Sequence, residues 1–256
     1  MSLPEIVGRE EWIRARVALL DQEKKLTAAR DELAAARRRL PMVEVTEDYR
    51  FTAEDGGARR LADLFEGRHQ LIVDHYMFDP DWEDGCMSCA GRVDQYGEIA
   101  HLHERDTTIA VVSRAPIARI SRWKRRMGWT FPWYSSFGSR FNFDFSVSFD
   151  DSVADPHYNY RSADDWAGRG FPRPDGELHG TSVFLRDGDR VFHTYSAYAR
   201  GTEQVGGTHY YLEMTPLGRQ EDWEEPAGRA RAFKPRADQP GAGETAGAPG
   251  AAAPPG

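Results

Sequence analysis

Residues 71–92 read LIVDHYMFDPDWEDGCMSCAGR, and this stretch decides the fold. Its first eight residues form an apolar run that predicts a buried strand over 71–78. An acidic loop follows, and the segment that begins at Cys86 has the composition of a helix. Both cysteines of the chain, Cys86 and Cys89, therefore stand in Cys-x-x-Cys spacing between a strand and a helix.

Strand-like and helical segments alternate after this stretch. We expect a helix from Cys86 to about Arg105, a strand over 107–113 (TTIAVVS), a helix over 116–127 that Gly128 ends, and a strand-like piece in WTFPWYSS (129–136). Helices of this length between strands predict right-handed crossovers and a parallel core to the sheet.

The next part of the chain adds antiparallel strands. TSVFLRDGDRVFHTYSAY (181–198) predicts a β-hairpin, and a helix is expected over 208–214. Between them and the earlier strands, residues 137–153 alternate phenylalanine with small or polar residues. This period of two indicates a strand, although a loop with a short helical turn also fits, and we interpret the phenylalanines as core rather than as a pocket wall. The fold class is thus α/β, a mixed sheet with helices on both faces.

A long helix precedes this domain. Residues 9–40 are rich in Ala, Glu, Arg, Lys and Leu, and an apolar stripe recurs every seven residues at Trp12, Leu19, Leu26, Leu33 and Leu40. The stripe either packs along the chain's own body or pairs with a second copy in a homodimer. Residues 41–67 predict a short β or irregular segment that turns at Asp55-Gly56-Gly57. The expected organisation is a helix over 1–40, an α/β domain over 41–225, and a disordered Pro/Gly/Ala-rich tail over 226–256.

Charge and composition limit the function classes. A net charge of −8 argues against general nucleic-acid binding, because phosphate neutralisation requires a basic face. No apolar run is long enough for a membrane span, and the charged N-terminus is unlike a secretory signal, so we expect a cytoplasmic protein. In that reducing compartment, a pair of cysteines indicates catalysis, redox sensing or metal binding rather than a structural disulfide.

The position of the cysteines indicates their roles. A thiol at the start of a helix lies near unpaired N–H groups that stabilise a thiolate, so we assign Cys86 as the nucleophile and Cys89 as the resolving thiol. Asp79, Asp81, Glu83 and Asp84 act against this, because nearby carboxylates raise a thiol pKa. The sequence leaves this competition open.

Several motifs together carry a family resemblance. They are the long helix, LPMVEV, the HYMF strand with its Cys-x-x-Cys, VVSRAP, KRRMGWTFPWYSSFGSRFNFDF, SVFLRDGDRVFHTYSAYARG and LEMTPLGR. Over roughly 10–225, the chain resembles a bacterial family of thioredoxin-like proteins of unknown function, described as predicted dithiol-disulfide oxidoreductases. The resemblance implies a thioredoxin-like fold and exchange with an unidentified thiol or disulfide substrate, without a cofactor or a metal.

The chain departs from working thioredoxins at several positions. Those enzymes have Trp before the first cysteine and Gly-Pro between the pair, whereas this chain has Gly85 and Met87-Ser88. The cis-proline that faces their disulfide is replaced by Gly180 or Thr181. We expect these two residues and Trp82, a lid over the pair, to contact substrate. Pro80 is one residue too close to Cys86 for the Pro-x-x-x-Thr/Ser-x-x-Cys motif of the peroxidases of this fold.

Other interpretations of the same residues remain open. Zinc needs four ligands, and the cysteines supply two. His101 and His103 face different sides of a helix, and His75 is a conceivable third ligand. Asp74, inside the strand, either accepts a proton from the resolving thiol or is solvated.

A thioredoxin-like binding module is the other alternative. Its aromatic pocket would be lined by Trp129, Phe131, Trp133 and Tyr134.

Overall fold

The computed structural model describes residues 4–150, 152–153 and 157–205. The helix expected over 208–214 and the tail expected over 226–256 lie outside the described residues. The chain divides into two compact units, with α1 (Arg9–Arg38) in the first and the described residues from Val43 onward in the second. The units are described one at a time.

The first unit contains the predicted long helix. Glu10 and Glu11 in its first turn and Arg37 and Arg38 in its last turn complement the helix dipole. None of the side chains of α1 is buried, and the leucines of the apolar stripe are about half exposed, for example Leu26 at 51%.

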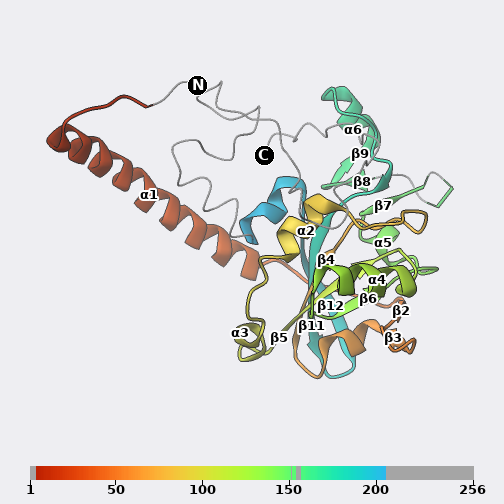
Figure 1. Ribbon diagram of the computed structural model, residues 1–256. Helices are drawn as coiled ribbons and strands as arrows, with labels where there is room; N and C mark the ends of the chain where they lie inside the picture. Colours follow the sequence, from red (N-terminus) through yellow and green to blue (C-terminus); the bar gives the residue numbers. More distant parts are fainter. Residues whose placement is uncertain (1–3, 151, 154–156, 206–256) are drawn as a thin grey trace. The chain divides into compact units, whose positions relative to one another are not determined.

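The second unit is built on a mixed sheet with the strand order β1-β12-β11-β4-β5-β6-β2-β3. Its strands are β1 (Val43–Glu44), β2 (Arg50–Thr52), β3 (Ala58–Arg60), β4 (Gln70–His75), β5 (Thr107–Ser113), β6 (Trp133–Ser135), β11 (Gly180–Asp187) and β12 (Arg190–Tyr198). Strands β4, β5 and β6 are parallel, and β11 is antiparallel to both β4 and β12. The predicted parallel core and hairpin are confirmed, and this is the thioredoxin-like arrangement (Figure 1).

Short helices cover both faces of the sheet. On one face, α2 (Met87–Val93) and α4 (Ile117–Met127) pack side chains such as Val93 and Trp123 against Val111 of β5. On the other face, the 3₁₀ helix η1 (Leu61–Phe65) and α5 (Phe141–Asp144) pack against Val73 and Phe184. Successive residues of β5 alternate between these two cores, with Val111 in the first and Ala110 and Val112 in the second, as the pleat of a strand requires.

Smaller elements border the sheet. Strand β7 (Ser148–Phe149) pairs with β10 (Gly176–Glu177), and β8 (His157–Tyr158) pairs with β9 (Arg161–Ser162). The short helices α3 (Ala100–His103), α6 (Ala163–Gly168) and η2 (Ala199–Val205) complete the described chain. None of the described helices combines the length and apolar character that a membrane span requires.

One sequence prediction is wrong in detail, and one open alternative is decided. The helix expected from Cys86 to Arg105 is interrupted, because Gly97 adopts a left-handed conformation (φ 58°) between α2 and α3. Residues 137–150 contain the short helix α5 and strand β7, so the alternative of a loop with a short helical turn fits better than one continuous strand. Phe141 and Phe145 are nevertheless buried, so their assignment to the core is confirmed.

Candidate redox site

Helix α2, which begins directly after Cys86 and contains Cys89, follows the loop after β4 (Figure 1). Cys86 caps the N-terminus of α2 with an extended backbone (φ −64°, ψ 123°), and Cys89 lies in the first turn of that helix. Both thiols are free; Cys86 is partly exposed and Cys89 is buried. The pair therefore has one accessible and one enclosed member.

The two thiols have opposite pKa shifts. A hydrogen bond from the Cys89 thiol is the largest cause that lowers the pKa of Cys86, to about 6; the N–H groups of Ser88 and Cys89 add to it, while burial opposes it. The pKa of Cys89 is raised because the same bond retains its proton and because burial and the Cys86 charge disfavour a second thiolate. At neutral pH the pair thus holds a thiolate on Cys86 and a thiol on Cys89.

Two aromatic side chains hold the backbone before α2. The Tyr76 hydroxyl donates to the carbonyl oxygen of Cys86 at 2.7 Å, and the Trp123 indole N–H donates to that hydroxyl at 3.0 Å. A Cβ atom at Gly85 would lie 2.8 Å from both the Trp123 Nε1 and the Tyr76 ring. Glycine therefore precedes Cys86 because Trp123, from α4, occupies the space that a side chain there would need.

The two acidic residues closest in sequence to Cys86 are paired with arginines of α4. Arg122 binds Glu83 at 2.9 Å, and Arg126 binds Asp84 at 3.0 Å. The guanidinium charges offset the carboxylate charges that would otherwise oppose a thiolate. These pairs explain why an acidic loop is compatible with the lowered pKa of Cys86.

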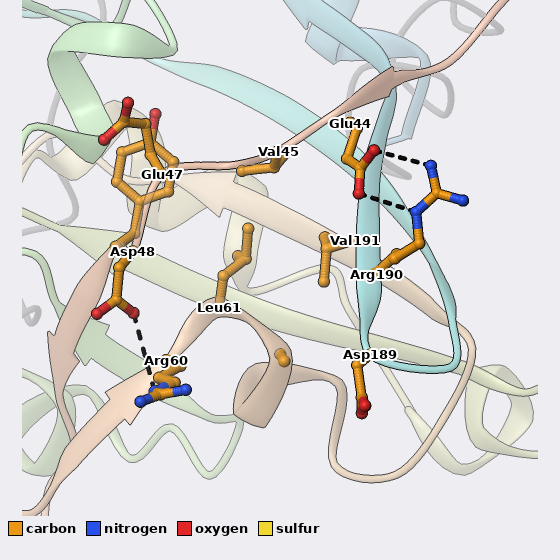
Figure 2. A pocket seen from close by; sticks show the side chains of 11 residues that line it. Glu44, Val45, Glu47, Asp48, Arg60, Leu61, Asp189, Arg190 and Val191 are labelled. Carbon is orange, nitrogen blue, oxygen red and sulfur yellow. Dashed lines mark hydrogen bonds and ion pairs between the residues drawn. The ribbon is translucent and has the colours of Figure 1, made fainter.

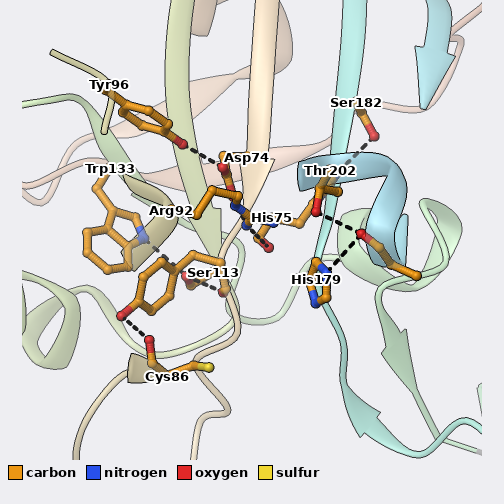
Figure 3. A network of polar contacts seen from close by, with 12 residues as sticks. Asp74, His75, Cys86, Arg92, Tyr96, Ser113, Trp133, His179, Ser182 and Thr202 are labelled. Atoms are coloured by element: carbon orange, nitrogen blue, oxygen red, sulfur yellow. Dashed lines mark hydrogen bonds and ion pairs between the residues drawn. The ribbon is translucent and has the colours of Figure 1, made fainter. Parts of the chain in front are cut away.

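Asp74 forms a buried ion pair with Arg92 (Figure 3). Arg92, on α2, binds one carboxylate oxygen, and the Tyr96 hydroxyl donates to the other at 2.6 Å. Arg92 also donates to the carbonyl oxygen of His75 at 3.4 Å. Asp74 is therefore not solvated, and both of its oxygens are engaged, which is unlike a carboxylate free to accept a proton.

His75 faces the opposite side of the sheet from the thiols. Its ring packs 5.5 Å from the Phe141 ring, and its Nε2 shares a hydrogen bond of 2.9 Å with Ser182. Burial lowers the His75 pKa to about 3, so the ring is neutral. His75 cannot complete a metal site with the cysteines, and no cluster of metal-ligating side chains occurs among the described residues.

The three predicted substrate contacts differ in their surroundings. Trp82 is 38% exposed, whereas Gly180 and Thr181 are buried on β11. A Cβ atom at Gly180 would lie 2.9 Å from both Tyr198 and Val147, so this position has no room for a proline without rearrangement. The Thr181 hydroxyl is buried and has no hydrogen-bond partner in the described part of the chain.

The aromatic segment after α4 is core, so the pocket predicted there is wrong. Trp129, Phe131 and Trp133 pack against one another with ring centroids 5.5 to 6.1 Å apart. Phe131 and Trp133 are almost completely buried, and Tyr134 packs against the core on the other face of the sheet.

The hollows in the surface lie elsewhere. One, of about 150 Å³, is bordered by ion pairs between Glu44 and Arg190 and between Asp48 and Arg60 (Figure 2). A larger hollow of about 500 Å³ adjoins the loop that follows β4 and includes Arg114. Ligands of open α/β sheets bind at this carboxyl edge, so the larger hollow is the better placed for a substrate.

Several polar residues of the site have weak signals or none in the sequence. Tyr96 has none, and Arg92 has only its position one helical turn after Cys89, a spacing that places both on one face. Glu177, buried, binds Arg114 and Ser148, each at 2.8 Å. Burial raises the Glu177 pKa to about 7. No local pattern predicts the Glu177 contacts, because its partners lie on β7 and on the loop after β5, far away in sequence.

The sequence of the chain also matches a protein family. A model described as "Bacterial protein of unknown function (DUF899)" matches residues 1–239. The chain belongs to the DUF899 family. No curated protein matches this DUF899 chain significantly in sequence.

Several solved structures are similar to the DUF899 chain at low identity. The bacterioferritin comigratory protein of Xanthomonas campestris is 14% identical, with 65% of this chain and 94% of that chain covered and a TM-score of 0.42. Peroxidoxin BcpB of Mycobacterium tuberculosis is 14% identical, with 62% and 85% covered and a TM-score of 0.42. Prx1a of Plasmodium yoelii is 12% identical, with 65% and 82% covered and a TM-score of 0.40. The case for a redox site rests on the cysteines and not on this likeness.

Proposed function

We propose that the protein is a thiol–disulfide oxidoreductase that uses Cys86 as nucleophile and Cys89 as resolving thiol. The observation that carries this proposal is the opposite pKa shift of the two thiols, down to about 6 for Cys86 and upward for Cys89. A structural pair of reduced cysteines has no need of such a division between thiolate and thiol.

The geometry supports a two-step exchange. The Cys86 thiolate attacks a substrate disulfide, forms a mixed disulfide and releases the first substrate sulfur as a thiolate. Cys89 then loses its proton to that leaving thiolate or to water and attacks the Cys86 sulfur, which releases the second substrate sulfur. Two electrons pass to the substrate, and Cys86 and Cys89 become a disulfide.

Reaction with 5,5′-dithiobis(2-nitrobenzoate) tests this assignment, because the chain has only two cysteines. The reduced protein should release two equivalents of thionitrobenzoate and retain none. Cys89→Ser should release one equivalent and retain one, whereas Cys86→Ser should react much more slowly near pH 6.5. Equal, slow reaction of the two single variants contradicts the proposal.

The substrate side of the exchange includes Thr181 in this proposal. The register places Thr181 opposite Asp74 on β4, so its side chain lies on the cysteine face of the sheet. A buried hydroxyl without a partner costs about 1–3 kcal/mol, which a substrate polar atom or a water molecule would recover. Trp82, exposed on the loop before Cys86, remains the proposed lid.

We also propose that α1 pairs with a second copy of the chain. The seven-residue spacing of its leucines suits a helix pair, and none of its side chains is buried. Light scattering of purified protein should give the mass of a dimer, and Leu26→Lys should give the mass of a monomer. A wild-type protein that is monomeric at micromolar concentration contradicts this pairing.

A further inference from the structure

We infer that the charge of Arg92 adds to the reactivity that the hydrogen bonds give Cys86, and that the buried carboxylate of Asp74 holds Arg92 in place and attenuates that charge. Arg92 is thus a positioning residue for the thiolate and has no contact with substrate. The inference rests on the proposed function, since it assigns the control of the same thiol pair.

The contacts of Arg92 with two neighbouring residues of β4 fix the position of its guanidinium group. Its guanidinium binds Asp74 and donates to the His75 carbonyl oxygen at 3.4 Å, and only 12% of its side chain is exposed. Tyr96 holds the second carboxylate oxygen of Asp74 at 2.6 Å, so the acid cannot rotate away (Figure 3). Arg92 and Cys89 lie one turn apart on α2, which orients this cation toward the thiol pair.

The hydrogen bonds of Arg92 are incomplete, which leaves part of its charge uncompensated. Its Nε–H group is buried and has no partner among the described residues. Asp74 receives a second bond from Tyr96, so it is shared between two donors. A buried cation in this state attracts negative charge on neighbouring groups, and the thiol pair is among the groups on which the Arg92 charge acts.

The electrostatic effects agree in sign. The Arg92 charge lowers the pKa of Cys86, and it also acts to lower that of Cys89 against the hydrogen bond and the burial that raise it. Burial would lower the pKa of Arg92 itself, yet the charge of Asp74 raises it above its ordinary value. Arg92 therefore stays protonated throughout the range in which Cys86 titrates.

The other ionisable groups around Cys86 do not supply a free positive charge. Tyr76 is neutral, because burial raises its pKa, and burial lowers the pKa of His179 to about 4. On the preceding loop, Glu83 and Asp84 are paired with arginines of α4. Asp94, at the end of α2, accepts a hydrogen bond from the Trp129 indole at 2.6 Å.

Single substitutions of the two partners should move Cys86 in opposite directions. Arg92→Met should slow iodoacetamide alkylation of Cys86 at pH 5.5 about three- to tenfold, because a smaller fraction is thiolate. Asp74→Asn should accelerate it about twofold, because the Arg92 charge is then unopposed. Arg92→Lys should retain most of the wild-type rate, and Arg105→Met, which removes an exposed arginine, is the control for net charge and should leave it unchanged.

The pH profile of alkylation separates the possible outcomes. A wild-type Cys86 that titrates near 8.5 contradicts the proposed function itself. The role of Arg92 is contradicted, and the proposed function is not, if the wild-type Cys86 pKa is low but Arg92→Met and Asp74→Asn shift that pKa in the same direction or not at all. If Arg92→Met does not fold, the double variant Arg92→Met/Asp74→Asn removes the unpaired carboxylate. Its alkylation rate should be lower than that of Arg92→Lys, and a rate equal to wild type contradicts the inference.

Discussion

The pH dependence of the reduction potential gives a quantitative test of the Cys86 thiolate. Formation of the disulfide removes two electrons and as many protons as the reduced pair carries. Below the Cys86 pKa of about 6 the reduced pair carries two protons, and above it the pair carries one, on Cys89. Each proton contributes about 30 mV per pH unit to a two-electron couple, so the slope should change from about −59 to about −30 mV per unit near pH 6.

The same shift predicts how oxidising the pair is. At pH 7, the thiolate of a cysteine with a pKa of about 6 is about ten times more abundant than its protonated thiol. An ordinary cysteine with a pKa near 8.5 is almost fully protonated at that pH. This difference stabilises the reduced state by about 1.4 kcal/mol, or about 30 mV of additional oxidising potential.

Equilibration in dithiothreitol buffers between pH 5 and pH 8, with acid quenching and alkylation of free thiols, measures the potential. The chain unfolded in urea provides the control, because its thiols are ordinary and its slope should remain near −59 mV per unit up to about pH 8.5. A folded protein whose slope also stays near −59 mV per unit up to pH 8 would refute the thiolate assignment.

Three further changes have defined outcomes. Gly85→Ala should lower the free energy of unfolding by about 1–3 kcal/mol in urea titrations, because its Cβ would press against Trp123, whereas Gly91→Ala, in α2 with open space around it, should raise it by up to about 1 kcal/mol. Glu177 keeps a proton in the folded chain up to about pH 7 that the unfolded chain releases near 4.5. Its contribution to stability therefore falls as the pH rises. The free energy of unfolding of the wild type, relative to that of Glu177→Gln, should decrease by up to about 3 kcal/mol between pH 4.5 and pH 7. Thr181→Val should raise the KM for a disulfide substrate while the Cys86 alkylation profile stays unchanged; a shift of that profile would contradict a substrate contact.

Local patterns were sufficient for most of the sheet. The apolar run before the cysteines, the TTIAVVS strand and the hairpin turn each follow from residues close in sequence, and β4, β5 and β11–β12 form where they were expected. Local patterns were not sufficient for residues 137–153. A period of two fits a strand, but Phe141 and Phe145 meet the same core from a single helical turn and the residue after it, because contacts with Tyr49 and Phe184 decide the packing.

The site itself depends on partners that no local pattern reveals. The Cys-x-x-Cys spacing identifies the thiols, but the ion pair of Asp74 with Arg92 joins a strand to a helix across the carboxyl edge of the sheet. The pairing of Thr181 with Asp74 depends on the register between β11 and β4. Contacts between elements distant in sequence set both features, so they become visible only in the folded chain.

The charge around Cys86 shows why local composition is a poor guide to thiol chemistry. Counted along the sequence, the loop before Cys86 is acidic and should favour a protonated thiol. Coulomb energies depend on distance in space, and α4 places Arg122 beside Glu83 and Arg126 beside Asp84 from positions 39 and 42 residues later. Exposed pairs of this kind contribute little to stability, yet each neutralises a carboxylate near the thiol. The remaining influences on Cys86 are a hydrogen bond from Cys89, the N–H groups of α2 and the charge of Arg92, so α4 supports the thiolate by cancelling charge rather than by adding it.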